Sequence, residues 1–206
     1  MKVLMLNGSP HLKGCTYTAL AEVANALSKE GVESTIVNVA QEPVQGCLGC
    51  RLCRRTGLCT CDDVVNRLIP LLSDHDALVV GSPVYYSGPN GALCAVLDRL
   101  FYAASGKLSY KPAASVCSAR RAGTTATLER LNQYFLINNM LVVGSDYWNM
   151  VHGNSPAEVR QDEEGMHVMR NLGHNLAWTL RLLEAGKENG VQRTLHEPAV
   201  QTNFIR

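Results

Sequence analysis

Short apolar segments that alternate with helical segments constrain the fold of this chain more than any other feature of its sequence. The apolar segments are rich in Val, Ile, Leu and Ala, as in strands that are buried on both faces of a sheet. We expect five strands, at residues 2–6, 34–39, 77–80, 113–117 and 140–143. This alternation predicts a three-layer α/β domain with a five-stranded parallel sheet.

Helical spacing of apolar residues fills the gaps between the strands. Leu20, Val23 and Leu27 recur in this way before Gly31, and later helices are expected at about 62–73, 92–104 and 125–138. A last amphipathic helix follows Ser155-Pro156-Ala157-Glu158, which has a capping-box pattern with proline at the first helical position. With no repeat or linker in view, we expect one domain over residues 1–187 and a C-terminal arm or tail over 188–206.

The balance of charge excludes some classes of partner. The formal net charge is +1, and basic residues cluster only at Arg51, Arg54 and Arg55, so the sequence indicates neither nucleic-acid nor membrane binding. No segment approaches the ~20 apolar residues of a membrane span, and the first residues lack the apolar core of a signal peptide. We therefore expect a cytoplasmic protein with reduced thiols.

Three turns that follow predicted strands contain the candidate ligand-binding residues. Parallel sheets bind ligands at the carboxyl ends of their strands, near the point where the strand order reverses. The turns after the first, third and fourth strands should therefore meet at one edge. They read GSPHLKGCT at 8–16, SPVYYSGPNG at 82–91 and SARRAGTT at 118–125.

The first turn suits a phosphate group. Gly8 permits a tight turn, Ser9 and Thr16 offer hydroxyls, and the following helix directs its free N–H groups at the turn. The turn is not a nucleotide P-loop, because Cys15 stands where lysine is needed, and it lacks the G-x-G-x-x-G of a dinucleotide site. A phosphate monoester is favoured over a triphosphate, and an ordinary glycine-rich turn is the alternative.

The other two turns offer aromatic and basic side chains. Tyr85 and Tyr86 could lie against a flat ligand, although tyrosines at a strand end also cap cores or fill interfaces. Arg120 and Arg121 could face an anionic ligand, or could belong to a solvated basic loop. Taken together, the three turns predict one elongated site.

Five of the eight cysteines lie in the segment GCLGCRLCRRTGLCTC, residues 46–61. Cys47, Cys50, Cys53 and Cys59 have the spacing C-x₂-C-x₂-C-x₅-C, a compact run of the kind that wraps an iron–sulfur cubane in ferredoxins. The last gap is longer than in ferredoxins, and Thr60 follows instead of proline. Zinc, a redox-active dithiol that includes Cys61, and free thiols all remain open alternatives.

The three turns, in this order and with Leu97-Asp98-Arg99 trailing the second, resemble those of the flavodoxin-like NADPH-dependent FMN reductases. The iron–sulfur flavoprotein branch is the most similar, because it has a compact four-cysteine motif in the same loop with Asp-Asp shortly after. The resemblance covers residues 2–184. It implies a flavodoxin-like fold with the cysteine-rich loop after the second strand, non-covalent FMN, a [4Fe–4S] cluster and a homodimer or homotetramer.

The resemblance also implies which residues contact each group. His11 and Cys15 replace an Arg and an Asn often found in the family. No catalytic side chain is implied, because the flavin carries the chemistry. The phosphate would be held by Ser9, His11, Gly14, Cys15 and Thr16, the isoalloxazine by Pro83, Val84, Tyr85, Tyr86, Ser87 and Gly88 on one side and by Ser118, Arg120, Arg121 and Gly123 on the other, and the cluster by Cys47, Cys50, Cys53 and Cys59.

The expected function is an FMN-dependent oxidoreductase. It would pass electrons from NAD(P)H or ferredoxin to a small acceptor such as a quinone, a flavin or an oxygen species, with the cluster as a one-electron relay. A flavodoxin-like electron carrier without its own substrate and a thiol-based redox sensor are the alternatives. The near-neutral charge disfavours the carrier, since flavodoxins are typically acidic.

Overall fold

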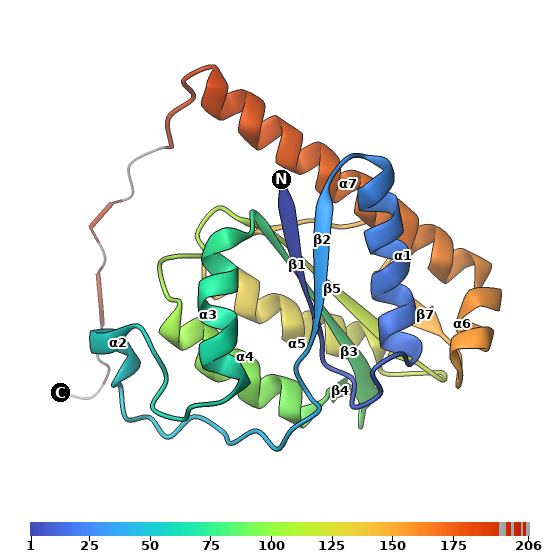
Figure 1. The fold of residues 1–206 in the computed structure, drawn as a ribbon, viewed down its shortest axis with the longest axis horizontal. Coiled ribbons are helices and arrows are strands. Elements are labelled where there is room, and N and C mark those ends of the chain that lie inside the picture. Colours follow the sequence, from blue (N-terminus) through green and yellow to red (C-terminus); the bar gives the residue numbers. More distant parts are fainter. Residues whose placement is uncertain (194–196, 199, 203, 205–206) are drawn as a thin grey trace.

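The computed structural model describes residues 1–193, 197–198, 200–202 and 204 of the chain. Its main sheet is parallel and has the strand order β2-β1-β3-β5-β6, so the order reverses at β1 as in doubly wound folds (Figure 1). This confirms the predicted parallel α/β architecture. The strands are β1 (Lys2–Asn7), β2 (Glu33–Asn38), β3 (Ala77–Tyr85), β5 (Pro112–Ala119) and β6 (Leu141–Val142).

Helices cover both faces of the sheet and bury its apolar side chains. Alternate residues of β1 point to opposite faces, so Leu4 and Leu6 join one core cluster while Val3 and Met5 join the other. The first cluster is covered by α3 (Val64–Asp74), α4 (Gly91–Ala103) and α5 (Thr124–Ile137), and the second by α1 (Cys15–Lys29) and α7 (Glu163–Glu188) (Figure 1).

The second turn differs from its prediction. Strand β3 does not end at Val80 but continues to Tyr85 and folds back through β4 (Gly88–Pro89) as an antiparallel hairpin. The expectation of one long turn over 82–91 is therefore wrong in its first half. Proline and glycine mark turns in a sequence, but here the strand keeps its pairing with β5 beyond the sequence signal.

The last predicted strand corresponds to β6, a further strand that was not predicted follows it, and the last predicted helix is divided in two. After β6, the chain leaves the sheet and returns as β7 (Met150–His152), which pairs with the end of β5. Ser155 caps the short helix α6 (Pro156–Gln161), and Asp162 caps α7 separately. A short helix that the sequence did not predict, α2 (Cys53–Thr56), lies within the cysteine segment.

The predicted C-terminal arm begins where α7 ends, at Glu188. Residues 189–193 contain no helix or strand. Residues 194–196, 199, 203 and 205–206 of the predicted arm lie outside the described residues. Among the helices of the described part, none combines the length and the apolar character that a membrane crossing requires.

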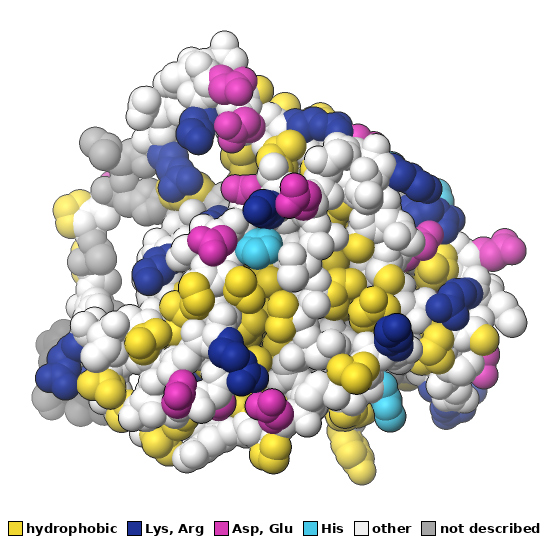
Figure 2. Space-filling model, in the orientation of Figure 1, with side chains coloured by type: hydrophobic (Ala, Val, Ile, Leu, Met, Phe, Trp, Pro, Cys, Tyr) yellow, Lys and Arg dark blue, Asp and Glu magenta, His cyan; other side chains and the backbone are white. Residues whose placement is uncertain are grey.

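Strand β2 is an edge strand of the sheet. Figure 2 shows the molecule in the orientation of Figure 1, and on the face turned to the viewer apolar side chains lie at the centre, with basic and acidic side chains scattered around them. Leu12, Tyr17 and Ile36 line a groove here, beside α1. On this face, basic and acidic side chains are intermixed.

Replacing Gly173 with alanine is expected to destabilise the protein, because α1 and α7 touch at this glycine. A Cβ atom there would lie 2.5 Å from Ala26 Cβ and 2.8 Å from the carbonyl oxygen of Val23. Overpacking of this kind costs about 1–3 kcal/mol, which lowers the melting temperature by about 2–12 °C. Gly186→Ala, in the same helix but with no neighbour closer than 3.8 Å, should leave the melting temperature equal or higher. Equal losses in both variants would contradict this packing.

Candidate functional site

The three predicted turns meet at the carboxyl edge of the sheet and contact one another. The N–H of Gly8 donates to the carbonyl oxygen of Gly81 at 2.8 Å, which joins the ends of β1 and β3. Nδ2 of Asn90 donates to the carbonyl oxygen of Gly8 at 2.7 Å. The hydroxyls of Thr16 and Ser118 are 2.8 Å apart and join the first turn to the third. The three turns that are predicted to form one elongated site therefore lie together.

The first turn leaves the amino end of α1 without a side-chain cap. Gly14 occupies the N-cap position and offers no side chain to the free N–H groups of the first helical turn. These N–H groups and the positive end of the helix dipole favour an anion, as the sequence predicted. His11 and Lys13 are exposed in the same turn.

The hydroxyls in this turn make hydrogen bonds within the protein. Ser9 is 3% exposed and its Oγ accepts from the N–H of His11, while Thr16 is 1% exposed and pairs with Ser118. The Ser9 contact lies within the first turn, and the Thr16 contact joins the first turn to the third. The sulfur of Cys15 contacts the carbonyl oxygen of Gly153 at 3.6 Å, and burial raises the pKa of this thiol, which keeps it neutral.

The tip of the β3–β4 hairpin exposes aromatic surface beside the other two turns. Tyr86 and Ser87 have φ of 50° and 58°, a conformation uncommon for residues other than glycine and often found at functional sites. Tyr85 and Tyr86 are both exposed. A Cβ on Gly123 would lie 2.8 Å from Ser87 Cα, so the third turn supports this tip at close range.

The third turn brings a second helix end to the same edge. Gly123, with φ of 88°, is the N-cap of α5 and again offers no side-chain cap. Arg120 and Arg121 precede it and are exposed. Two helix amino ends, two exposed arginines and two exposed tyrosines suit a flat, anionic ligand. The residues present therefore fit a flavin mononucleotide.

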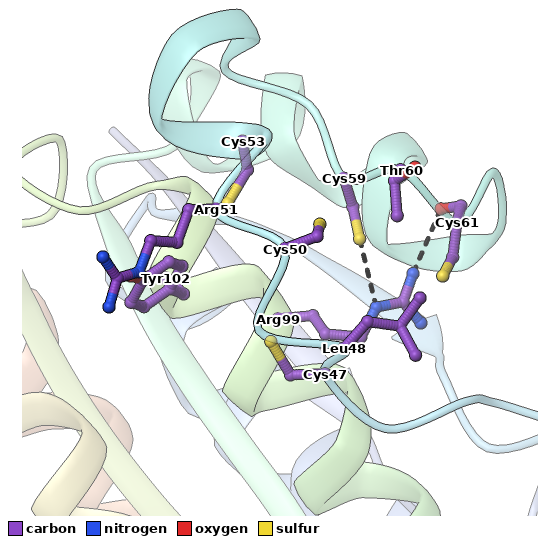
Figure 3. A pocket seen from close by; sticks show the side chains of 10 residues that line it. All are labelled: Cys47, Leu48, Cys50, Arg51, Cys53, Cys59, Thr60, Cys61, Arg99 and Tyr102. Atoms are coloured by element: carbon purple, nitrogen blue, oxygen red, sulfur yellow. Dashed lines mark hydrogen bonds between the residues drawn. The ribbon is translucent and has the colours of Figure 1, made fainter.

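The cysteine segment forms a second site, on the side of α4 (Figure 3). All five of its thiols, with Arg99 and Tyr102 of α4, line one pocket, and all eight cysteines of the chain are free. Burial, and then the neighbouring thiols of Cys59, Cys50 and Cys47, raise the pKa of Cys53. The four predicted ligands are therefore close enough to influence one another.

The thiols line this pocket but are not gathered around a single point. Within the described part of the chain, no three cysteine, histidine or carboxylate side chains are close enough together to hold one ion. The donor set nevertheless fits an iron–sulfur cluster, because thiolates are its preferred ligands and four of them come from one short segment. Gly49 and Arg51, both at positive φ, separate the first thiols, and Cys61 lies at the edge of the group (Figure 3).

Two residues outside the segment hold Cys59, and the sequence did not identify either of them as part of the site. Asn66 of α3 accepts from the N–H of Cys59 at 2.8 Å and donates to its carbonyl oxygen at 3.0 Å. Arg99 donates from Nε to the sulfur of Cys59 at 3.3 Å. The motif Leu97-Asp98-Arg99 was a signal for Arg99, but only as a mark of resemblance.

Arg99 also forms a salt bridge with Asp63, at 2.6 Å between Nη1 and Oδ2. Burial alone would raise the pKa of Asp63, but hydrogen bonds from Arg99 and from the N–H of Val65 hold that pKa below its usual value. Burial alone would lower the pKa of Arg99, but its bonds to Asp63 and Cys59 raise it. Both members of the pair are therefore ionised.

Comparison with known proteins identifies the family of this chain. The family model described as NADPH-dependent FMN reductase matches residues 1–155, which is most of the chain. The chain belongs to the NADPH-dependent FMN reductase family. It is therefore a flavin-dependent oxidoreductase, and FMN is the flavin of the family.

Relatives within the family are iron–sulfur flavoproteins. One from Methanocaldococcus jannaschii is 31% identical over 192 residues, which are 89% of this chain and 100% of the relative. Another, from Methanosarcina thermophila, is 27% identical over 194 residues, 91% of this chain and 100% of the relative. The chain thus lies in the iron–sulfur flavoprotein branch of the FMN reductase family.

Solved structures with the same fold include flavoproteins. RosB, with 8-demethyl-8-formylriboflavin 5′-phosphate bound, has a TM-score of 0.71 at 16% identity and covers 100% of this chain and 94% of its own. A flavodoxin, WrbA-like protein from Agrobacterium tumefaciens has a TM-score of 0.60 at 17% identity and covers 88% of this chain and 96% of its own. At such identities these structures establish the fold alone, which is flavodoxin-like.

Proposed function

We propose that this member of the FMN reductase family takes electrons from NAD(P)H or ferredoxin and passes them to a small acceptor, with a [4Fe–4S] cluster as a one-electron relay. The acceptor would be a quinone, a flavin or an oxygen species, and the reaction would take place in the cytoplasm. The observation that carries the proposal is the position of the five-thiol pocket. It lies beside α4 (Gly91–Ala103), and the amino end of the same helix lies at the flavin edge.

FMN supplies the hydride and single-electron chemistry when bound, and the chain supplies its position and electrostatic surroundings. The uncapped amino end of α1 would hold the phosphate, with His11 exposed beside it. The hairpin tip at Tyr85 and Tyr86 would lie along one side of the ring. Arg120 and Arg121 would lie on the other side and offset negative charge there.

The cluster would be held by Cys47, Cys50, Cys53 and Cys59 in the cysteine segment. Arg54 stacks on the ring of Tyr102 with its guanidinium carbon 4.9 Å from the centroid, which ties α2 to α4. Arginines in and beside this pocket would partly offset the negative charge that thiolates bring. The donor set therefore supports a cluster better than a zinc knuckle with two separated cysteine pairs.

Helix α4 connects the two sites. Its N-cap, Asn90, donates to Gly8 at the flavin edge, and Arg99 on the same helix contacts Cys59. From Gly91 to Arg99 the helix rises by about 12 Å. A rigid helix of this length would keep the two redox groups at a fixed short separation, which favours a relay over two independent sites.

A homodimer or homotetramer is part of the proposal. Large apolar side chains at the end of α5, in β6 and on α7 are exposed on the single chain, which is typical of interfaces. Analytical ultracentrifugation tests the assembly. The side chains concerned are Leu136, Ile137, Leu141, Val142, Trp178 and Leu182.

Anaerobic purification with FMN, iron and sulfide counted per chain is the direct test. One FMN with about four irons and four sulfides supports the proposed centres. Steady oxidation of NAD(P)H with a quinone then supports the enzyme. Reduction by ferredoxin alone and no turnover of a small acceptor would favour the electron carrier. FMN without iron, even after anaerobic reconstitution, would remove the relay from the proposal and leave a plain FMN reductase.

A further inference from the structure

The buried guanidinium of Arg99 lies at the cysteine pocket. Its side chain is 1% exposed, in the middle of α4, and arginine is rarely so buried unless it is paired. A guanidinium has five N–H donors. All five of them have acceptors in this structure.

Every one of these acceptors belongs to the cysteine segment or to its immediate borders. Nε donates to the sulfur of Cys59 at 3.3 Å, while Nη1 and Nη2 each donate to one carboxylate oxygen of Asp63. The remaining two donors reach backbone carbonyl oxygens, of Gln45 at 3.1 Å and of Cys61 at 3.1 Å. Arg99 thus joins the residues before the first thiol of the segment to those after the last.

The contact with Cys59 is directed at its sulfur, whereas the contact with Cys61 is directed at its backbone. Figure 3 shows both bonds leaving the same guanidinium. Arg99 therefore distinguishes Cys59 from Cys61, which lie only two residues apart as candidates for the fourth ligand. The geometry favours Cys59 as the fourth thiol, with Cys61 serving through its carbonyl group.

We propose that Arg99 positions the cysteine segment for metal binding and donates its Nε–H to the Cys59 sulfur when that sulfur is a cluster ligand. The inference rests on the proposed function, because it assumes that the segment holds a cluster. Arg99 is then a positioning residue and not a ligand, since guanidinium has no lone pair to offer a metal at neutral pH.

Two measurable consequences follow for the loaded protein. A donor to a ligating sulfur stabilises the reduced, more negative form of a cluster, so Arg99 should raise the reduction potential. Residues that orient ligands typically contribute 10–100-fold to metal affinity. Loss of Arg99 should therefore lower the potential and accelerate the loss of iron to a chelator by at least about tenfold.

Arg99→Met and Arg67→Met form a matched pair for this test. Arg67 lies in α3 and pairs at 3.3 Å with Glu42, which precedes the segment, and both of these side chains are more than half exposed. We expect R99M to have a more negative cluster potential and faster iron loss, with FMN content unchanged, and R67M to behave as the wild type. A potential in R99M equal to that of the wild type would overturn the inference.

Asp63→Asn provides a second variant in case R99M does not fold. Asparagine keeps the N-cap of α3, where Asp63 accepts from the N–H of Val65, and it leaves Arg99 in place. Removing this negative charge beside the pocket should shift the potential upward, opposite to R99M. A downward shift in D63N would contradict the assigned electrostatics.

Limited proteolysis of the metal-free protein separates this inference from the proposed function. Trypsin can cleave at Arg51, Arg54 and Arg55 within the segment. If Arg99 orders the segment, cleavage there should be at least about tenfold faster in R99M than in the wild type or R67M. An unchanged cleavage rate in metal-free R99M overturns the ordering role, even if the wild-type protein is found to bind iron in the separate iron assay. If the wild-type protein binds no iron, the proposed relay and the contact between Arg99 and a cluster ligand are both wrong. Faster cleavage in R99M would still support the ordering role of Arg99.

Discussion

Replacing Cys59 with serine is expected to abolish cluster binding while FMN stays bound. Cys59 is the last of the four predicted ligands, and it is held at its backbone by Asn66 and at its sulfur by Arg99. Serine keeps the backbone contacts but removes the thiolate that iron requires. Iron should fall from about four to below about one per chain in protein purified or reconstituted anaerobically.

Cys61→Ser is the matched control for this change. Cys61 lies two residues further along the segment and lines the same pocket, but Arg99 contacts its carbonyl oxygen, which the substitution leaves intact. We expect C61S to keep its iron and its electron paramagnetic resonance spectrum. If C61S loses iron and C59S does not, the fourth ligand is Cys61 and the assignment from spacing is wrong.

FMN content is the internal reference in both variants. The flavin edge lies at the amino end of α4, while the cysteine pocket lies beside Arg99 further along that helix. Loss of FMN together with iron in C59S would indicate unfolding, and circular dichroism would detect that unfolding. The Cys59 result therefore reports on the cluster only when FMN is retained.

The strands and helices of the sheet were predictable from local sequence because each obeys one clear period. β1 is apolar from Val3 to Leu6 and buried on both faces, and α1 has its apolar residues at helical spacing. The extension of β3 to Tyr85 was missed because its pairing comes from β5, which is distant in sequence. Strand β7 was likewise missed, because it depends on pairing with the distant end of β5.

The candidate sites were predictable to the level of segments, but not of contacts. The three turns were found because parallel strands end at one edge. That Thr16 and Ser118 bond to each other could not be foreseen, because each hydroxyl alone suits a phosphate equally well. Arg99 was missed because a basic residue in a helix normally points to solvent, and only the fold places it under the cysteine segment.

Replacing Gly14 with aspartate is expected to weaken FMN binding by about a hundredfold. Gly14 is the N-cap of α1, and its φ of −82° accepts other residues. Aspartate there would occupy the free N–H groups and place a negative charge where the phosphate is proposed to bind. Unit charges about 4 Å apart repel by about 1–4 kcal/mol between bulk water and a protein surface, and tenfold in affinity is about 1.4 kcal/mol.

Gly14→Ser separates charge from shape in this experiment. Both variants add the same Cβ, which would lie 2.9 Å from Cβ of His11, and both side chains can cap the helix. Only aspartate adds charge, so the ratio of their FMN dissociation constants, measured by fluorescence quenching, isolates the electrostatic part. Increasing salt should reduce that ratio, because the turn is exposed to solvent. Equal affinities in G14D and G14S would place the phosphate elsewhere, and α5 at Gly123 would then be the other uncapped helix end at this edge.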